Sequence, residues 1–225
     1  MQSLEPDPEI DAVHHFYACL APLIDPKDGL GGKLLFAGEL DQNATHLIRA
    51  ANIAGAATLA ASADAAALRQ ALREGVIDFL VTTLDESLRI LKNEIRKRQP
   101  VAVAVSQAAS AIALEMLDRG VQPDLLPPAT KSTATSLSGF TALGARHISP
   151  PPPSTRTLLA LSIPVTWSNR PAEFEALLAT HIAPDDHANL RWLHLSPRYL
   201  GHAARRIRSL ECPPAIAAQL QADLG

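Results

Sequence analysis

Short apolar runs alternate with longer amphipathic segments along the chain as far as residue 126. The runs predict strands at residues 33–38, 58–62, 79–82, 101–105 and 124–126. The segments between them repeat apolar residues at helical spacing and predict helices at residues 42–55, 65–74, 85–98 and 107–118. Strands that alternate with helices in this way are typical of right-handed βαβ units. We therefore expect an α/β fold, with a Rossmann-like parallel sheet flanked by helices.

The rest of the pattern predicts a boundary near residue 150. A helix is expected at 11–25, before the first strand, and residues 127–149 are rich in Ser, Thr, Gly and Pro and predict a loop. Pro150–Pro153 is a run of four prolines, which is typical of a stiff, extended connection. We expect a Rossmann-like domain at 1–149 and a smaller helical C-terminal segment at 150–225 that packs on it. The elements expected in that segment are a strand at 158–161 and helices at 171–181 and 187–209.

Composition and charge exclude several classes of protein. Apolar residues make up 47% of the chain and charged residues 19%, which is typical of a globular protein rather than a disordered one. A net charge of -3 does not favour nucleic acid or an anionic membrane as a partner. Cys19 and Cys212 predict no disulfide framework, and no apolar run is long enough to span a membrane. With no signal-peptide pattern at residues 1–10, we expect a cytoplasmic protein. Its Ala-rich helices also suit the interface of a homo-oligomer.

The turn after the first predicted strand is the place to look for a dinucleotide. A Rossmann site needs several glycines there, so that backbone N–H groups approach a pyrophosphate at a helix N-terminus. Here Gly38 is the single glycine, and Glu39 and Asp41 stand where the phosphates would bind. Ser62 follows the second strand, where an acid would bind the ribose, and Asp64 predicts a helix cap. These residues favour a structural turn over a dinucleotide site.

Several segments, in one order, are typical of a single protein family. They are Gly32–Leu34, AGAATLAASAD (54–64), REGVID (73–78), TLDESL (83–88), LDRGVQPDLL (117–126) and Ser138–Phe140. Beyond the prolines, residues 164–205 carry Trp167, Trp192, Gly201 and Arg205 at matching positions. Together they resemble the central, NAD-binding region of the urocanate hydratase (urocanase) family. The resemblance implies a Rossmann-like core. Since the family's substrate domain and C-terminal region have no counterpart here, it also implies a truncated relative.

The resemblance also identifies the positions at which the family holds its cofactor. They are Gly38, Ser62, Gln107, Lys131, Ser132 and Arg205. The family binds NAD⁺ tightly and uses it as an electrophile toward the imidazole of its substrate. In this chain the glycine-rich loop is reduced to Gly38, Ser62 replaces an acid, and Gln107 stands where the family has glycine. Lys131 is compatible with an exposed surface lysine or with a cation that holds a phosphate or carboxylate. We expect a degenerate NAD-binding domain with no cofactor.

These observations predict a urocanase-like protein without catalytic residues, which binds a small ligand or a protein partner. No HExxH or Cys-x-x-Cys spacing accompanies the histidines, so no metal is expected. One alternative is a protein that binds NAD, another nucleotide or an anion through Lys131, Ser132 and Ser62. Another is a urocanate hydratase-like lyase of histidine degradation, with a second chain supplying the substrate domain.

Overall fold

The computed structural model describes residues 7–130, 137–151, 153–201 and 206–224, which belong to two compact units. Residues 16–150 form the first, called the sheet unit here. Residues 1–15 and 151–225 form the second unit. Helix α1 (Pro8–Leu20) is divided between them, with the boundary after His15. The His14 ring lies edge-on against Trp192 of the second unit, with 4.7 Å between the ring centroids.

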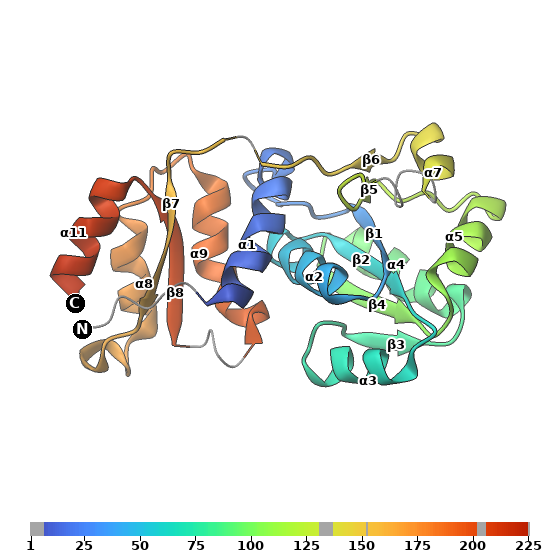
Figure 1. The fold of residues 1–225 in the computed structure, drawn as a ribbon, viewed down its shortest axis with the longest axis horizontal. Helices are drawn as coiled ribbons and strands as arrows, with labels where there is room; N and C mark the ends of the chain where they lie inside the picture. Colours follow the sequence, from blue (N-terminus) through green and yellow to red (C-terminus); the bar gives the residue numbers. More distant parts are fainter. Residues whose placement is uncertain (1–6, 131–136, 152, 202–205, 225) are drawn as a thin grey trace. The chain divides into compact units, whose positions relative to one another are not determined.

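The sheet unit is built on a six-stranded parallel sheet in the order β3-β4-β2-β1-β5-β6 (Figure 1). Its strands are β1 (Leu34–Glu39), β2 (Ala57–Ala61), β3 (Phe79–Val81), β4 (Val101–Val105), β5 (Leu125–Leu126) and β6 (Arg146–His147). Every residue of β2 and β4 is buried, which explains why they are continuous apolar runs without alternation. The predicted Rossmann-like α/β sheet is confirmed.

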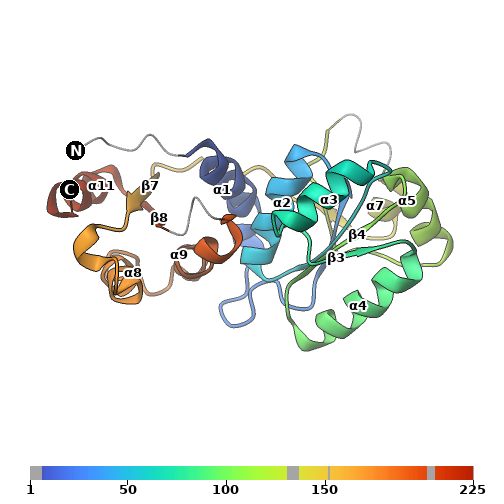
Figure 2. The same ribbon diagram turned by 90° about the horizontal axis from the view of Figure 1, so that it is seen from below.

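Helices cover both faces of this sheet. They are α2 (Gln42–Ala54), α3 (Ala65–Arg73), α4 (Leu84–Lys97) and α5 (Ala109–Asp118), and a 3-10 turn, η1 (Ala21–Leu23), follows α1. Helices α2 and α3 lie on one side of the sheet and α4 lies on the other (Figure 2). Helix α5 packs against β1 and α4. Each helix begins where a strand has just ended, so the N-termini of α2 to α5 lie at one edge of the sheet. We call it the carboxyl edge.

The prediction of a loop at residues 127–149 is wrong in part. This segment contains a short helix, α7 (Ser138–Ala142), and the last strand, β6. Phe140 is fully buried, and its ring packs against that of Phe36 with 5.8 Å between centroids. Because this packing joins residues far apart in the sequence, it orders a segment whose composition alone indicates a loop.

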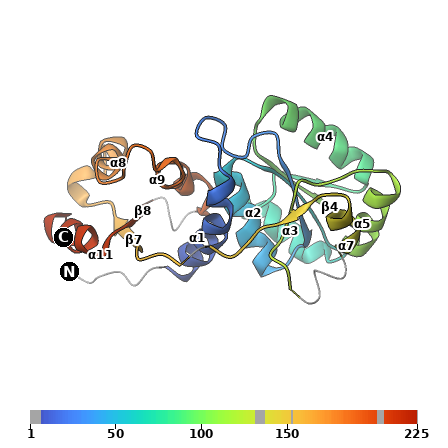
Figure 3. The ribbon, with the colours of Figure 1, turned by 90° about the horizontal axis from the view of Figure 1, so that it is seen from above.

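The second unit is an antiparallel pair of strands, β7 (Thr157–Ser162) and β8 (Ile207–Cys212), surrounded by helices (Figure 3). The helices are α8 (Pro171–Ala179), α9 (His187–Tyr199) and α11 (Pro214–Leu224), and the 3-10 turn η2 (Val165–Trp167) precedes α8. The predicted helix at 187–209 is wrong at its C-terminal end, since Ile207 begins β8. Its partner β7 lies far upstream in the sequence, and local periodicity does not reveal such a pairing.

Along the described ranges, no helix combines the length and the apolar character needed to cross a membrane.

Candidate functional site

Three of the predicted cofactor positions lie together at the carboxyl edge. Gly38 is in β1, Ser62 directly follows β2, and Gln107 follows β4. These strands are neighbours, with Gly38 opposite Ala60 and Ala60 opposite Ala104. The other predicted positions, Lys131, Ser132 and Arg205, lie outside the described residues.

The backbone alone explains why Gly38 is a glycine. Its φ is +80°, and the β1–β2 register shifts between Phe36 and Gly38, which marks a bulge. A Cβ atom at Gly38 would meet nothing within 4 Å. The residue is therefore needed for a left-handed conformation and not for a close approach to neighbouring atoms.

The side chains of Ser62 and Gln107 are engaged in local structure. Ser62 is 2% exposed, and its hydroxyl oxygen accepts a hydrogen bond of 3.1 Å from the backbone N–H of Asp64. The Gln107 side-chain amide donates to the carbonyl oxygen of Thr82 at 2.8 Å. Both residues therefore fix the turns that follow their strands, and the buried hydroxyl of Ser62 is poorly placed to meet a ribose.

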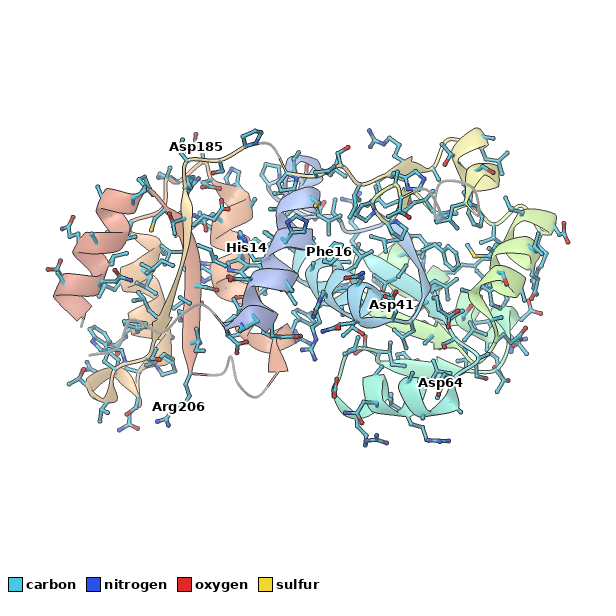
Figure 4. The ribbon with its side chains drawn as sticks, viewed as in Figure 1. His14, Phe16, Asp41, Asp64, Asp185 and Arg206 are labelled. Atoms are coloured by element: carbon cyan, nitrogen blue, oxygen red, sulfur yellow. The ribbon has the colours of Figure 1, made fainter. Side chains whose placement is uncertain are left out.

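Aspartates cap the two helices on one face of the sheet, α2 and α3 (Figure 4). The Asp41 carboxylate accepts a hydrogen bond of 2.8 Å from the backbone N–H of Ala44. The Asp64 carboxylate accepts from Ala66 and Ala67 at 2.7 and 3.2 Å. The predicted cap at Asp64 is confirmed, whereas the cap at Asp41 was missed. Its signal is the same, an aspartate directly before a predicted helix.

The N-terminus of α5 takes its acceptor from a different strand. The capping residue, Ala108, has no side-chain acceptor. Instead, the backbone N–H of Ala109 donates to Glu39 Oε2, at the end of β1, over 3.3 Å. The two residues are 70 positions apart, so no local sequence pattern predicts this contact.

Helix α4 begins with a capping box, a reciprocal pair of side-chain to backbone hydrogen bonds. The Thr83 hydroxyl accepts from the backbone N–H of Glu86 at 3.2 Å. The Glu86 carboxylate accepts from the backbone N–H groups of Thr82 and Thr83 at 2.9 and 3.2 Å. The hydrogen bonds from Thr82 are the main reason that the pKa of Glu86 lies below its ordinary value.

Backbone N–H groups at the N-termini of α2, α3, α4 and α5 therefore already donate hydrogen bonds to side-chain oxygen atoms of the chain itself. Four carboxylates take part in these bonds, and we call them the edge carboxylates: Glu39, Asp41, Asp64 and Glu86. A Rossmann site places the pyrophosphate at the N-terminus of the helix after its first strand, which here is α2. Asp41 already holds that place. Two like charges about 4 Å apart repel by ~1 kcal/mol in bulk water and by ~4 kcal/mol at an effective dielectric constant of about 20. The residues at this edge do not fit a pyrophosphate.

The described part of the chain contains no cluster of side chains that is suited to bind a metal ion. No group of three or more His, Cys, Asp or Glu side chains is placed there to hold a metal ion.

Comparison with known protein families agrees with the arrangement of the sheet unit. A family model, the urocanase Rossmann-like domain, matches residues 16–146. The match covers more than half of the chain and nearly the whole sheet unit, residues 16–150. It includes β1 to β5, the first residue of β6 and each helix capped by an edge carboxylate. This chain belongs to the urocanase family.

Proposed function

We propose that this urocanase-family protein lacks urocanate hydratase activity and canonical NAD binding, and that it acts by binding a small ligand or a protein partner. The observation that carries the proposal is the cap on α2, where the Asp41 carboxylate accepts from the backbone N–H of Ala44. A dinucleotide would have to displace this carboxylate and bind beside its charge.

The neighbouring contacts support the same conclusion. Glu39 adds a second negative charge to the turn after β1, and its carboxylate accepts from the N-terminus of α5. Ser62 stands where an acid would bind the ribose, and its hydroxyl is buried and bonded to the backbone of Asp64. Of the three predicted cofactor positions among the described residues, the side chains of Ser62 and Gln107 are thus both used for internal hydrogen bonds.

Thermal unfolding in the presence of candidate ligands tests this proposal. The ligands are NAD⁺, NADH, ATP, urocanate and inorganic phosphate, each in large excess over the protein. A ligand at 100 times its Kd stabilises the folded state by about 2.7 kcal/mol, which raises Tm by several degrees. We expect no shift with NAD⁺, NADH or urocanate, and no turnover of urocanate.

Two results would support other functions. A shift with NAD⁺ together with turnover of urocanate would return the protein to the urocanate hydratase-type lyases. A shift with phosphate or ATP alone would favour anion binding, and the variant Lys131→Gln should then abolish it. A control, Arg69→Gln, removes the same charge from an exposed position on α3.

A further inference from the structure

A pocket of about 540 Å³ lies at the opposite edge of the sheet, where β1, β5 and β6 begin. Lys33 directly precedes β1, Asp124 directly precedes β5, and Arg146 is the first residue of β6. All of its lining residues belong to the sheet unit. Its volume is within the range of small-molecule sites, which is about 300–1,000 Å³. We call it the amino-edge pocket.

Among the described residues that line this pocket, the one negative charge, the Asp124 carboxylate, is engaged in contacts within the chain. One oxygen of the Asp124 carboxylate accepts from Lys33 Nζ at 2.9 Å. The other oxygen accepts from the backbone N–H of Leu34 at 2.9 Å. Asp124 thus joins the starts of β1 and β5, and Lys33 balances its charge.

Arg146 provides a positive charge that no internal contact balances. Its backbone N–H donates to the carbonyl oxygen of Asp124 at 3.0 Å, which fixes the residue at the rim of the pocket. Its side chain is exposed, and no acceptor within the described ranges bonds to its guanidinium group. Lys33, Asp124 and Arg146 therefore leave one net positive charge with unused donors.

Leucine side chains provide an apolar surface beside this charge. Leu23 supplies most of this surface, because it lies partly exposed, whereas Leu30 and Leu125 also line the pocket but are each only 3% exposed. A backbone hydrogen bond fixes Leu30 to the end of α2, since its N–H donates to the carbonyl oxygen of Ala54 at 2.7 Å. A ligand that matches the pocket has one negative charge and an apolar body.

We propose that the amino-edge pocket binds a monoanionic organic acid. Its carboxylate bonds to Arg146, with Lys33 as a second donor, and its apolar part packs mainly on Leu23, beside the largely buried Leu30 and Leu125. Arg146 matches a carboxylate because the planar guanidinium group donates two parallel hydrogen bonds. This assignment rests on the proposed function in one respect, because it names the small ligand that the protein binds. It would hold whether or not the protein binds NAD.

A titration with two probes of equal shape tests the charge requirement. Naphthoate carries a carboxylate on an apolar ring system, and naphthamide is its neutral counterpart. Binding of each is followed by ligand-observed NMR. We expect naphthoate to bind at least about 10-fold more tightly than naphthamide, because a hydrogen bond to a charged group is worth more than one between neutral groups.

Two matched variants locate the site. Arg146→Gln removes the unbalanced charge and keeps the backbone N–H that bonds to Asp124. It should weaken naphthoate binding about 10-fold. Arg69→Gln makes the same change on the exposed face of α3, outside the pocket lining, and should leave the affinity unchanged. Far-UV circular dichroism confirms that each variant is folded.

Several outcomes would overturn the proposal. They are equal affinity for naphthoate and naphthamide, equal loss of affinity in the two variants, and failure of naphthoate to bind at all. Inorganic phosphate that bound as tightly as naphthoate, and depended on Arg146, would show that the apolar part contributes nothing. NAD⁺ is titrated in parallel. Binding of NAD⁺ would overturn the proposed loss of the cofactor, whereas failure of naphthoate would overturn the assignment of this pocket.

Discussion

The two edges of the parallel sheet treat charge in opposite ways. At the carboxyl edge, helix N-termini offer N–H donors, and the edge carboxylates of the chain itself accept from them. At the amino edge, Lys33 balances Asp124, and Arg146 bonds to no acceptor within the described ranges. Open α/β sheets generally bind ligands at the carboxyl edge. The comparison teaches that a shared fold does not determine which edge of this sheet is open to a ligand.

The edge carboxylate Glu86 makes the stability of the sheet unit depend on pH. The largest change of stability with pH is nevertheless expected in the second unit, so the two have to be separated. Burial is the main cause that lowers the pKa of His14 from 6.5 to about 4, and the charge of His15 adds to it. Glu211 Oε1 lies 3.8 Å from His14 Nε2, and burial raises the pKa of that carboxyl. As the pH falls, the unfolded state takes up this proton first. The stabilisation that depends on neutral His14 is therefore fully present above pH 6.5 and is lost as the pH falls toward 4. Its loss lowers the free energy of unfolding by about 3 kcal/mol.

The variant His14→Phe should remove most of this loss, because a neutral ring then packs on Trp192. Urea unfolding at pH 7 and at low pH, monitored by tryptophan fluorescence, measures the loss of stability in both proteins. Both tryptophans, Trp167 and Trp192, belong to the second unit, so the signal reports on that unit. An unchanged pH dependence in the variant would assign the acid response to other groups.

Removing a cap at the carboxyl edge should have the next largest effect. Asp41→Ala and Asp64→Ala each remove a side-chain acceptor from a helix N-terminus, at a cost of about 1 kcal/mol in the free energy of unfolding. Asp41→Asn and Asp64→Asn keep an acceptor and should cost much less. Urea unfolding followed by far-UV circular dichroism measures both pairs. Equal stability of Asp41→Ala and the natural chain would contradict the cap on α2.

A smaller effect is expected when a carboxylate is neutralised at the amino edge. Asp124→Asn keeps an acceptor for the backbone N–H of Leu34 and releases Lys33 from its ion pair. Because exposed ion pairs are worth up to about 1 kcal/mol, naphthoate should bind about threefold more tightly. Asp41→Asn, at the other edge, should leave naphthoate binding unchanged. The same NMR titration measures both variants, and equal effects would remove the distinction between the edges.

The smallest effect is expected at Glu86. Hydrogen bonds from Thr82 lower the pKa of this exposed carboxylate below 4.5. A group with a lowered pKa stabilises the folded state above its unfolded pKa, and this stabilisation is lost as the pH falls through the folded pKa. Glu86→Gln, made in the His14→Phe background, should therefore flatten the acid dependence of Tm below pH 4.5. An acid dependence that was as steep as before would argue against this capping box.

Local patterns in the sequence predict most of the sheet, because buried parallel strands are apolar runs. The predicted strand at 101–105 agrees with β4 at both ends, and Asp64 caps α3 as expected. Long-range packing accounts for the errors. Phe140 orders α7 by packing on Phe36, and β8 pairs with a strand far upstream. At the candidate site, the sequence reveals the charges of Glu39 and Asp41, but not that Glu39 reaches the N-terminus of α5.

The most direct test of the account is a calorimetric titration of NAD⁺ into the natural chain, with the double variant Glu39→Gln/Asp41→Asn beside it. In the natural chain, Glu39 at the end of β1 and Asp41 at the start of α2 oppose the phosphates of a dinucleotide by their charge. The account predicts no saturable heat for the natural chain. Saturable binding of NAD⁺ to the natural chain would contradict it, and an equal affinity in the variant would show that the two carboxylates do not oppose the dinucleotide.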